Sequence, residues 1–321
     1  MIAGCLPDIA PKLLSEKSSS RVINWRDDED KMEEFFGANN VKLNQASNIL
    51  VEKQFCEDTE KYRKENPDKD ATFHDQFIKL LISEGCNFDC TYCSERLMFP
   101  PYRSFQEEKL VQACRSMIEK TGKHEVILMA DSLGDYGKDI GTNLPSLIRK
   151  LKTIHPDLKV ALNNLNPASF IEYFDQIVDF LKNGDIRHLN LPIQSASPLI
   201  LKLMDRSYTR EDINRIFNLL NNIGFKEFDT HIIIGFPGET ADDFEETITF
   251  LLHYKPKHVL TSRYMEAPEM PSAVLPNKVD LKTMINRSQE AFKRLTGAGI
   301  ICNTDDSDLA KDRLKRINLY K

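Results

Sequence analysis

The feature of this 321-residue sequence that most limits its fold is a regular alternation of strand-like and helix-like segments. Short apolar runs of the kind that buried strands give alternate with longer segments whose apolar residues recur at helical spacing. Six βα steps in succession predict an α/β fold in which a parallel sheet curls toward a partial (β/α)6 TIM-like barrel. The strand-like runs are 77–83, 125–130, 159–164, 188–194, 228–235 and 258–264.

The starts of three helices are marked by capping-box spacing, in which Ser or Thr is followed three positions later by an acidic residue. The pairs are Ser104 with Glu107, Thr209 with Asp212, and Thr240 with Asp243. Further helices are expected from Leu144 and near 168–182, and Cys114 is expected in the core. Loops from separate strands converge at the carboxyl ends of a parallel barrel, so the chemistry is expected there.

The first 72 residues follow a different pattern. Residues 1–50 hold strand-like runs at "MIAG" and "RVINW" with helical segments between and after them, which predicts a small α/β piece. Residues 51–72 are dense in charge and lack an apolar period, as a solvated linker does. The barrel is expected over 73–300, with a C-terminal tail at 301–321.

Composition excludes several classes of protein. No apolar stretch reaches the ~18 residues of a membrane span, and no basic and apolar leader precedes Cys5. We therefore expect a cytoplasmic protein that contacts no membrane and whose seven cysteines stay reduced. A net charge of -6 disfavours a strongly basic nucleic-acid binder, although the basic segment 311–321 could still contact phosphates.

Three cysteines stand together within eight residues, directly after the first strand of the barrel. Thiolates at Cys86, Cys90 and Cys93 can hold three corners of a [4Fe-4S] cluster and leave one iron open. Structural zinc is the alternative, but it needs four ligands, typically in two pairs, and the sequence has no second pair. A chance group of core cysteines is disfavoured by polar neighbours such as Asp89 and Ser94.

The Cys86-x3-Cys90-x2-Cys93 spacing, with the aromatic Tyr92 before the last cysteine, resembles the radical S-adenosylmethionine (SAM) superfamily. The resemblance implies that the open iron chelates SAM. An electron passed through the cluster then releases a 5′-deoxyadenosyl radical that abstracts hydrogen from the substrate. It also implies a reductant protein, such as a flavodoxin or a ferredoxin, as partner. The cofactor supplies this chemistry, and the protein supplies placement and the exclusion of water.

Three further segments, 136–151, 191–209 and 232–251, resemble the methylthiotransferases of this superfamily. "DIGTNLP" and "QSAS" are most similar to the archaeal and eukaryotic branch, which methylthiolates N6-threonylcarbamoyladenosine beside the anticodon of tRNA. The resemblance implies a transferase with tRNA as its partner. Residues 1–14 are similar to the C-terminal portion of the family's Rossmann-like N-terminal domain.

The resemblance also implies cofactor contacts. Arg206 is expected to pair with the SAM carboxylate, since a guanidinium binds carboxylate through two parallel hydrogen bonds. Gly235, Phe236 and Pro237 of the "GFPGE" loop are expected beside the adenine. A surface arginine and an ordinary strand-to-helix turn are the plain alternatives. The other implied SAM contacts are Tyr92, Asn163, Asn164, Gln194 and Ser195, the last two with side chains at the rim. His231 stands where the family usually has an acidic residue, and a satisfied core or rim histidine is expected there.

The sequence departs from the family pattern at three points. Of the three N-terminal cysteines that hold a second iron–sulfur cluster in the family, only Cys5 has a match. No RNA-binding β-barrel follows the core, and the loop at 94–105 lacks the usual Arg-Gly pair. Two alternatives therefore stay open: a radical SAM enzyme that modifies a small molecule or a peptide without an auxiliary cluster, and a non-catalytic binding remnant.

Overall fold

The structure is a computed structural model that describes residues 2–4, 22–24, 77–97 and 101–303. The chain divides into two compact units, Met1–Gln76 and Phe77–Lys321. In the first unit, β1 (Ile2–Gly4) pairs in parallel with β2 (Val22–Asn24), which confirms the two expected strands. Cys5 and the predicted linker lie outside the described residues.

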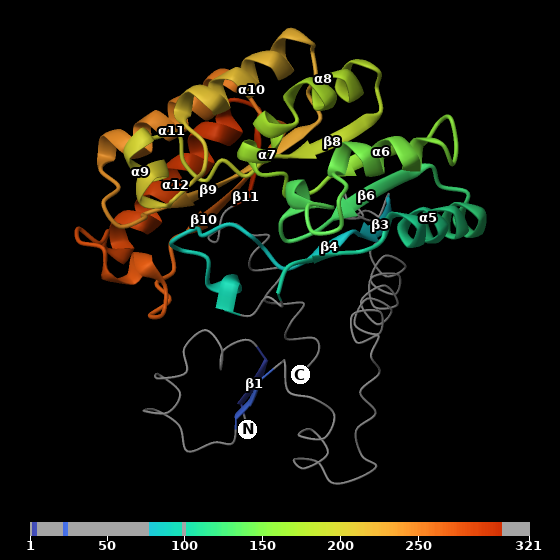
Figure 1. Ribbon diagram of the computed structural model, residues 1–321. Helices are drawn as coiled ribbons and strands as arrows, with labels where there is room; N and C mark the ends of the chain where they lie inside the picture. Colours follow the sequence, from blue (N-terminus) through green and yellow to red (C-terminus); the bar gives the residue numbers. More distant parts are fainter. Residues whose placement is uncertain (1, 5–21, 25–76, 98–100, 304–321) are drawn as a thin grey trace, which may run out of the picture. The chain divides into compact units, whose positions relative to one another are not determined.

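The second unit is built on a seven-stranded sheet in which every neighbouring pair is parallel and spatial order follows chain order (Figure 1). This arrangement confirms the predicted α/β fold. All six predicted strands are present, and a short seventh, β11, pairs with β10 within the segment expected as tail. The strands are β3 (Ile78–Leu81), β6 (Glu125–Met129), β7 (Lys159–Leu162), β8 (Ile186–Asn190), β9 (Phe228–Ile234), β10 (His258–Arg263) and β11 (Ile301–Asn303).

The helices form an arc over one face of this sheet (Figure 1). They are α5 (Glu107–Thr121), α6 (Leu144–Lys152), α7 (Pro167–Glu172), α8 (Phe174–Lys182), α9 (Pro198–Leu203), α10 (Arg210–Asn222), α11 (Ala241–Tyr254) and α12 (Leu281–Gly297). Single 3-10 turns lie at η2 (Ser94–Leu97), η3 (Leu133–Asp135) and η4 (Pro271–Val274), and β4 (Ser83–Glu84) pairs antiparallel with β5 (Arg103–Ser104). Among the described helices, none combines the length and apolar character that crossing a bilayer requires.

Two of the three predicted capping boxes are present. Thr209 and Thr240 each accept from the backbone of the third helical residue, whose carboxylate accepts from the capping residue in return. The prediction for Ser104 is wrong, because α5 is capped at Gln106 without a side-chain bond. Ser104 belongs to β5 instead, and its hydroxyl accepts from the amide of Gly137 at 2.8 Å.

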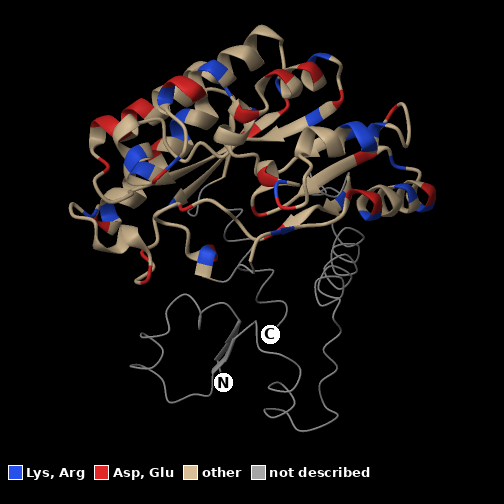
Figure 2. Cartoon of the chain, viewed as in Figure 1, with Lys and Arg blue, Asp and Glu red and all other residues tan. Residues whose placement is uncertain are grey.

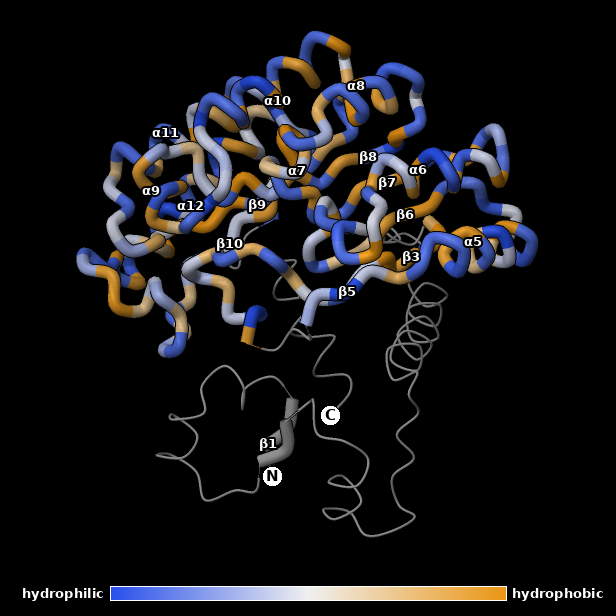
Figure 3. The backbone as a smooth tube through the Cα atoms, in the orientation of Figure 1, coloured by the Kyte–Doolittle hydropathy of each residue, from blue (hydrophilic) through white to orange (hydrophobic). Residues whose placement is uncertain are grey.

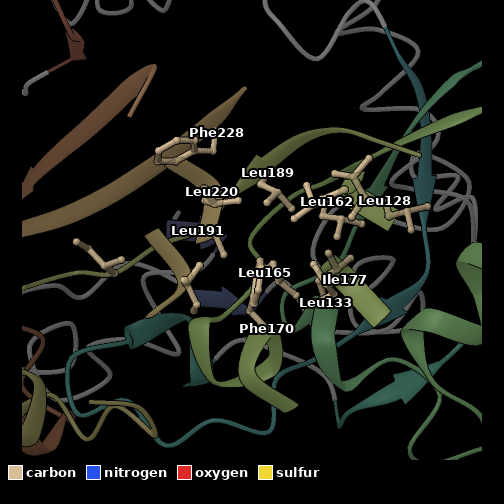
Figure 4. Packing of buried hydrophobic residues seen from close by; sticks show 14 of the residues in the cluster. Leu128, Leu133, Leu162, Leu165, Phe170, Ile177, Leu189, Leu191, Leu220 and Phe228 are labelled. Atoms are coloured by element: carbon tan, nitrogen blue, oxygen red, sulfur yellow. The ribbon is translucent and has the colours of Figure 1, made fainter. Parts of the chain in front are cut away.

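The core lies between the sheet and its helices. Buried strand residues such as Leu128, Leu162, Leu189 and Phe228 pack against helix residues such as Ile177 and Leu220 (Figure 4). Charged residues are concentrated on the outer surfaces of the helices (Figure 2), and the hydrophobic trace follows the strands (Figure 3). Cys114 is fully buried in this core, as predicted.

The opposite face of the sheet has a different composition where β8, β9 and β10 adjoin. Side chains alternate between the two faces of a strand, so residues next to core-facing positions point to this other side. On β8–β10 they include His188, Asn190, Asp229, His231 and His258, which we call the polar face. Asn190 is the register partner of Asp229, which is in turn the partner of His258.

Candidate functional site

The residues expected to bind the cofactors follow the carboxyl ends of four parallel strands. The cysteine loop comes after β3 and β4, Asn163 and Asn164 after β7, Gln194 and Ser195 after β8, and Gly235–Pro237 after β9. Because these ends share one edge of the sheet, the fold brings together segments far apart in sequence. The assignment of each residue to SAM stays a prediction.

The cysteine loop is anchored through Thr91, which lies between two of the cysteines. Its amide donates to the carbonyl of Met204 at 3.1 Å, and its hydroxyl donates to the carbonyl of Leu203 at 2.8 Å. Its own carbonyl accepts from the amide of Ser272 at 3.0 Å. The loop is therefore fixed to the end of α9 and to the segment after β10, independently of its sulfur atoms.

The start of the loop is held by a second contact. Asp131, at the carboxyl end of β6, accepts from the amide of Gly85 at 2.9 Å. Burial raises the pKa of Asp131 above its usual value, and this hydrogen bond offsets only part of the rise. The residue that precedes Cys86 is thus tied to the neighbouring strand.

The side chain of Arg206 contacts one of the three thiols of the predicted site. Arg206 Nη1 donates to Cys90 Sγ at 3.0 Å and to Tyr92 Oη at 3.1 Å. Its Nε donates to Tyr208 Oη at 2.9 Å, and Nη2 donates to the carbonyl of Pro192 at 3.2 Å. Burial opposes the charge on Arg206, but Tyr208, Tyr92 and Cys90 outweigh burial and raise its pKa, so the guanidinium stays charged.

The donor set fits an iron–sulfur cluster with one open corner. Burial raises the pKa of Cys86, and raises that of Cys93 to about 11, with the nearby Cys90 adding to both shifts. Iron would displace these thiol protons, since metals bind the thiolate form. The other cysteines in the described part of the chain, Cys114 and Cys302, are buried in the hydrophobic core and provide no fourth ligand.

A single metal ion bound directly by side chains is the alternative to a cluster at this site. Within the ranges that the structure describes, no group of three or more His, Cys, Asp or Glu side chains is placed to hold one ion. A [4Fe-4S] cube differs from such a site because each thiolate binds its own iron. The three thiols on one loop therefore match the cube in number and in chemistry.

The "GFPGE" loop is held in shape by Glu239. Its carboxylate accepts from the amide of Gly235 at 2.8 Å and from Arg287 of α12 at 2.6 Å. Burial raises the pKa of Glu239 to about 7. The Gly235 amide and Arg287 favour the charged carboxylate and offset only part of that rise. Gly235 has φ +81°, and an added Cβ would lie 2.2 Å from Met284 Cγ, so only glycine fits.

Sequence reasoning missed the pairing of Glu239 with Arg287. The glutamate was visible as the last residue of "GFPGE", but its partner lies 48 positions away on a helix that carried no motif. Only the fold brings these two charges together.

Aromatic contacts join the "GFPGE" loop to the cysteine loop. Phe236 is fully buried, and the Tyr92 ring meets it edge-on with centroids 6.3 Å apart. The Tyr264 ring also meets Phe236 edge-on, with centroids 5.4 Å apart, and the Tyr264 hydroxyl donates to Ser272, the residue that also contacts Thr91. The two loops expected around the cofactors therefore form one connected structure.

Two predicted contact residues have a backbone conformation that is uncommon outside glycine. Asn164 and Gln194 have φ of +58° and +62°. Gln194 continues the sheet, because its amide donates to the carbonyl of His231 at 2.8 Å and its carbonyl accepts from Ile233 at 2.9 Å. Left-handed backbone at non-glycine residues is concentrated at functional sites, so these two positions favour a binding edge.

Ser195 departs from expectation. Its side chain was expected at the rim, but the residue is only 1% exposed. Its hydroxyl lies 3.2 Å from Thr247 Oγ1 of α11 and accepts from the amide of Ser197. The polar character of Ser195 is used to join the strand end to α11, and sequence alone does not separate that role from a rim contact.

The sequence is similar to a known protein family and to proteins with assigned activities. The family model of the radical SAM superfamily matches residues 80–251, more than half of the chain. A probable threonylcarbamoyladenosine tRNA methylthiotransferase of Pyrococcus horikoshii is 29% identical over 276 residues, which cover 84% of this chain and 61% of that protein. The threonylcarbamoyladenosine tRNA methylthiotransferase of Caenorhabditis elegans is 32% identical over 204 residues, 63% of this chain and 48% of its own.

Solved structures agree on the fold. Coproporphyrinogen III oxidase from Escherichia coli, a radical SAM enzyme, superposes with a TM-score of 0.51 at 14% identity. The match covers 70% of this chain and 52% of that enzyme. The chain thus spans about half to three-fifths of the length of the two curated relatives described above.

Proposed function

Since this chain belongs to the radical SAM superfamily, and is therefore an enzyme that uses a [4Fe-4S] cluster and SAM, we propose that it transfers a methylthio group to N6-threonylcarbamoyladenosine in tRNA. The observation that carries the proposal is its similarity to curated threonylcarbamoyladenosine tRNA methylthiotransferases over most of its length. "QSAS", which resembles this branch, and "GFPGE", which resembles the methylthiotransferases as a whole, lie at or directly after the carboxyl ends of the strands.

The proposal assigns a role to each part of the edge. Cys86, Cys90 and Cys93 hold three corners of the cluster, and Thr91 fixes the loop that carries them. When bound, the cluster and SAM supply a 5′-deoxyadenosyl radical. The edge-on contact between the partly buried Tyr92 ring and the fully buried Phe236 ring gives the proposed site an apolar wall that helps to exclude water.

Further SAM contacts are proposed along the same edge. Gly235 and Pro237 form the turn beside the adenine, while Asn163, Asn164 and Gln194 face the remainder of SAM. The positive φ of Asn164 and Gln194 supports this placement, since strained backbone persists where function requires it.

Methylthio transfer also needs a source of sulfur and an electron donor. We propose that Cys5 is one ligand of a second cluster, as the family resemblance implies. A flavodoxin or a ferredoxin is the proposed reductant. We place the enzyme in the cytoplasm, where tRNA and such reductants are found together.

Iron content and SAM cleavage test the cofactor part of the proposal. Anaerobically reconstituted protein is expected to hold at least one cluster and to release 5′-deoxyadenosine from SAM under reduction. About four irons per chain would mean a single cube, and about eight would mean that a second cluster is present. A value near four would disfavour methylthiolation by this chain alone and would favour a small-molecule or peptide substrate.

Mass spectrometry of tRNA nucleosides tests the substrate. Cells that lack the gene should lose the methylthiolated base, and the wild-type gene should restore it. Cys90→Ala should fail to restore it, whereas Cys114→Ala, a change in the core away from the edge, is the control that should succeed. Unchanged nucleoside levels in the deletion strain would reject tRNA as substrate. SAM cleavage without tRNA modification would leave the alternative substrates, and absence of both would favour the non-catalytic remnant.

A further inference from the structure

The guanidinium of Arg206 is directed at a cluster ligand. It reaches Cys90 Sγ across 116 positions of sequence at 3.0 Å, and all three of its nitrogens donate to groups of the chain itself. Tyr208 fixes the far side of the guanidinium, because the Tyr208 hydroxyl also lies 2.8 Å from the carbonyl of Ile193. The side chain is thus held in place before any ligand binds.

A charged donor at this position affects the redox chemistry of a cluster. Reduction adds an electron to a centre that already carries thiolate charge, and a nearby cation stabilises the more negative state. Hydrogen bonds to cluster sulfurs and the net charge around a cluster are among the factors that set its reduction potential. A charge-assisted bond to sulfur is also stronger than a neutral one.

We propose that Arg206 is a positioning residue of the cluster, which orients the Cys90 thiolate and raises the reduction potential of the [4Fe-4S] centre. This role differs from the salt bridge to the SAM carboxylate that the sequence suggested. The inference rests on the cluster of the proposed function and is independent of the tRNA substrate.

The geometry favours the cluster over SAM as the partner of Arg206. A carboxylate clamp presents two parallel N–H groups to its ligand. Here Nη1 is engaged by Cys90 and Tyr92, Nε by Tyr208, and Nη2 by Pro192. No parallel pair of donors is left unengaged, so binding a carboxylate in that mode would require breaking bonds that the folded chain already makes.

The test is a redox titration of the reconstituted full chain, followed by electron paramagnetic resonance without SAM. Arg206→Gln removes the charge and should lower the equilibrium constant for one-electron reduction about tenfold, which is a shift of about 59 mV to more negative potential. Arg206→Lys keeps the charge but loses the fixed geometry, and a smaller shift in the same direction is expected. SAM affinity of the oxidised protein should stay within about twofold of wild type.

Arg210→Gln is the matched control. Arg210 is also a half-buried arginine that donates to a backbone carbonyl, that of Ala196, and its guanidinium lies over the Phe250 ring instead of beside a cysteine. The reduction potential of the cluster and the iron content of Arg210→Gln should match those of wild type. A shift in Arg210→Gln equal to that in Arg206→Gln would show a general effect of arginine loss and would overturn the proposal.

The remaining outcomes are also decisive. An unchanged potential with SAM affinity lowered tenfold or more in Arg206→Gln would overturn the proposal in favour of the carboxylate role. Loss of iron from both Arg206 variants, with wild-type circular dichroism and iron retained in Arg210→Gln, would support positioning of Cys90. A wild-type protein without any cluster would reject the proposed function itself, whereas a normal wild-type cluster with an unshifted Arg206→Gln potential would reject only this inference.

Discussion

Where β8, β9 and β10 adjoin, the two faces of the seven-stranded sheet carry opposite kinds of side chain. Toward the helices, β6, β7, β8 and β9 contribute fully buried apolar residues such as Leu128, Leu162 and Leu189. On the polar face, His188 Nε2 lies 3.1 Å from Asp229 Oδ2, and Asn190 Nδ2 lies 3.1 Å from His231 Nε2. Burying polar groups costs free energy unless they are paired, so the polar face depends on these specific pairs, whereas the helix-packed face needs only apolar side chains.

The contrast separates residues that the fold needs for apolar packing from polar residues that packing alone does not explain. Any well-packed apolar set would serve the helix-packed face. The polar face adjoins the strand ends that carry the proposed cofactor contacts, and Asn190 joins the two by accepting from the amide of Asn164 at 3.3 Å. We therefore interpret the polar face as part of the functional half of the molecule.

The largest expected effect separates a cysteine of the edge from a cysteine of the core. Cys90→Ala removes one of the three proposed cluster ligands and should abolish iron binding and SAM cleavage completely. Cys114→Ala leaves a small cavity beneath α5 and should lower the free energy of unfolding by about 1–3 kcal/mol while iron content stays at the wild-type level. Iron assay and chemical denaturation of both variants measure the two effects.

The opposite pattern would break the comparison. Wild-type iron in Cys90→Ala, or iron lost from a folded Cys114→Ala, would mean that the two cysteines have been assigned to the wrong regions.

The next effect tests the helix-packed face by itself. Leu162 is fully buried between β7 and the helices, and Leu162→Ala should destabilise the protein by about 2–5 kcal/mol through lost apolar burial and a residual cavity. Urea denaturation at pH 7 measures this. A loss below about 1 kcal/mol would show that the core tolerates a cavity there and that the helix-packed face is not the main source of stability.

The helix-packed face was also the part that the sequence predicted best. Runs rich in Ile, Val and Leu gave six of the seven strands, and the relatives confirm the resemblance to radical SAM methylthiotransferases. The strand β11 was missed because three residues with one exposed apolar side chain give no periodic signal. The short helix α9 was missed because its residues lie inside a segment that was interpreted as a motif.

The site was only partly predictable, for a different physical reason. Spacing along one loop was enough to predict Cys86, Cys90 and Cys93 as one ligand set, and that assignment stays a prediction. The bond from Arg206 to Cys90 joins positions 116 residues apart, and local sequence cannot encode such a pairing. For Ser195 the sequence predicted a position at the rim that the structure does not show. A polar residue at a strand end can face either the rim or a neighbouring helix, and Ser195 faces α11.

The smallest predicted effect separates the two faces by their dependence on pH. Burial lowers the pKa of His231 to about 4, with His258 adding to the shift, so the folded protein keeps this imidazole neutral. An unfolded histidine has a pKa of about 6.5. Between these values the unfolded chain binds a proton that the native chain excludes. The stabilising contribution is therefore complete above about pH 6.5 and is lost as pH falls through about 4.

Replacing His231 should remove that dependence. Asn cannot titrate in this range and keeps a hydrogen-bonding amide opposite Asn190, so His231→Asn should lose about 2 kcal/mol less stability than wild type between pH 7 and pH 4.5. Leu162→Ala is the matched control, because a loss of apolar burial should be equal at both pH values. Denaturation curves at the two pH values give both differences. Equal pH slopes for wild type and His231→Asn would contradict a neutral, buried His231, and would leave the polar face without its proposed difference from the helix-packed face.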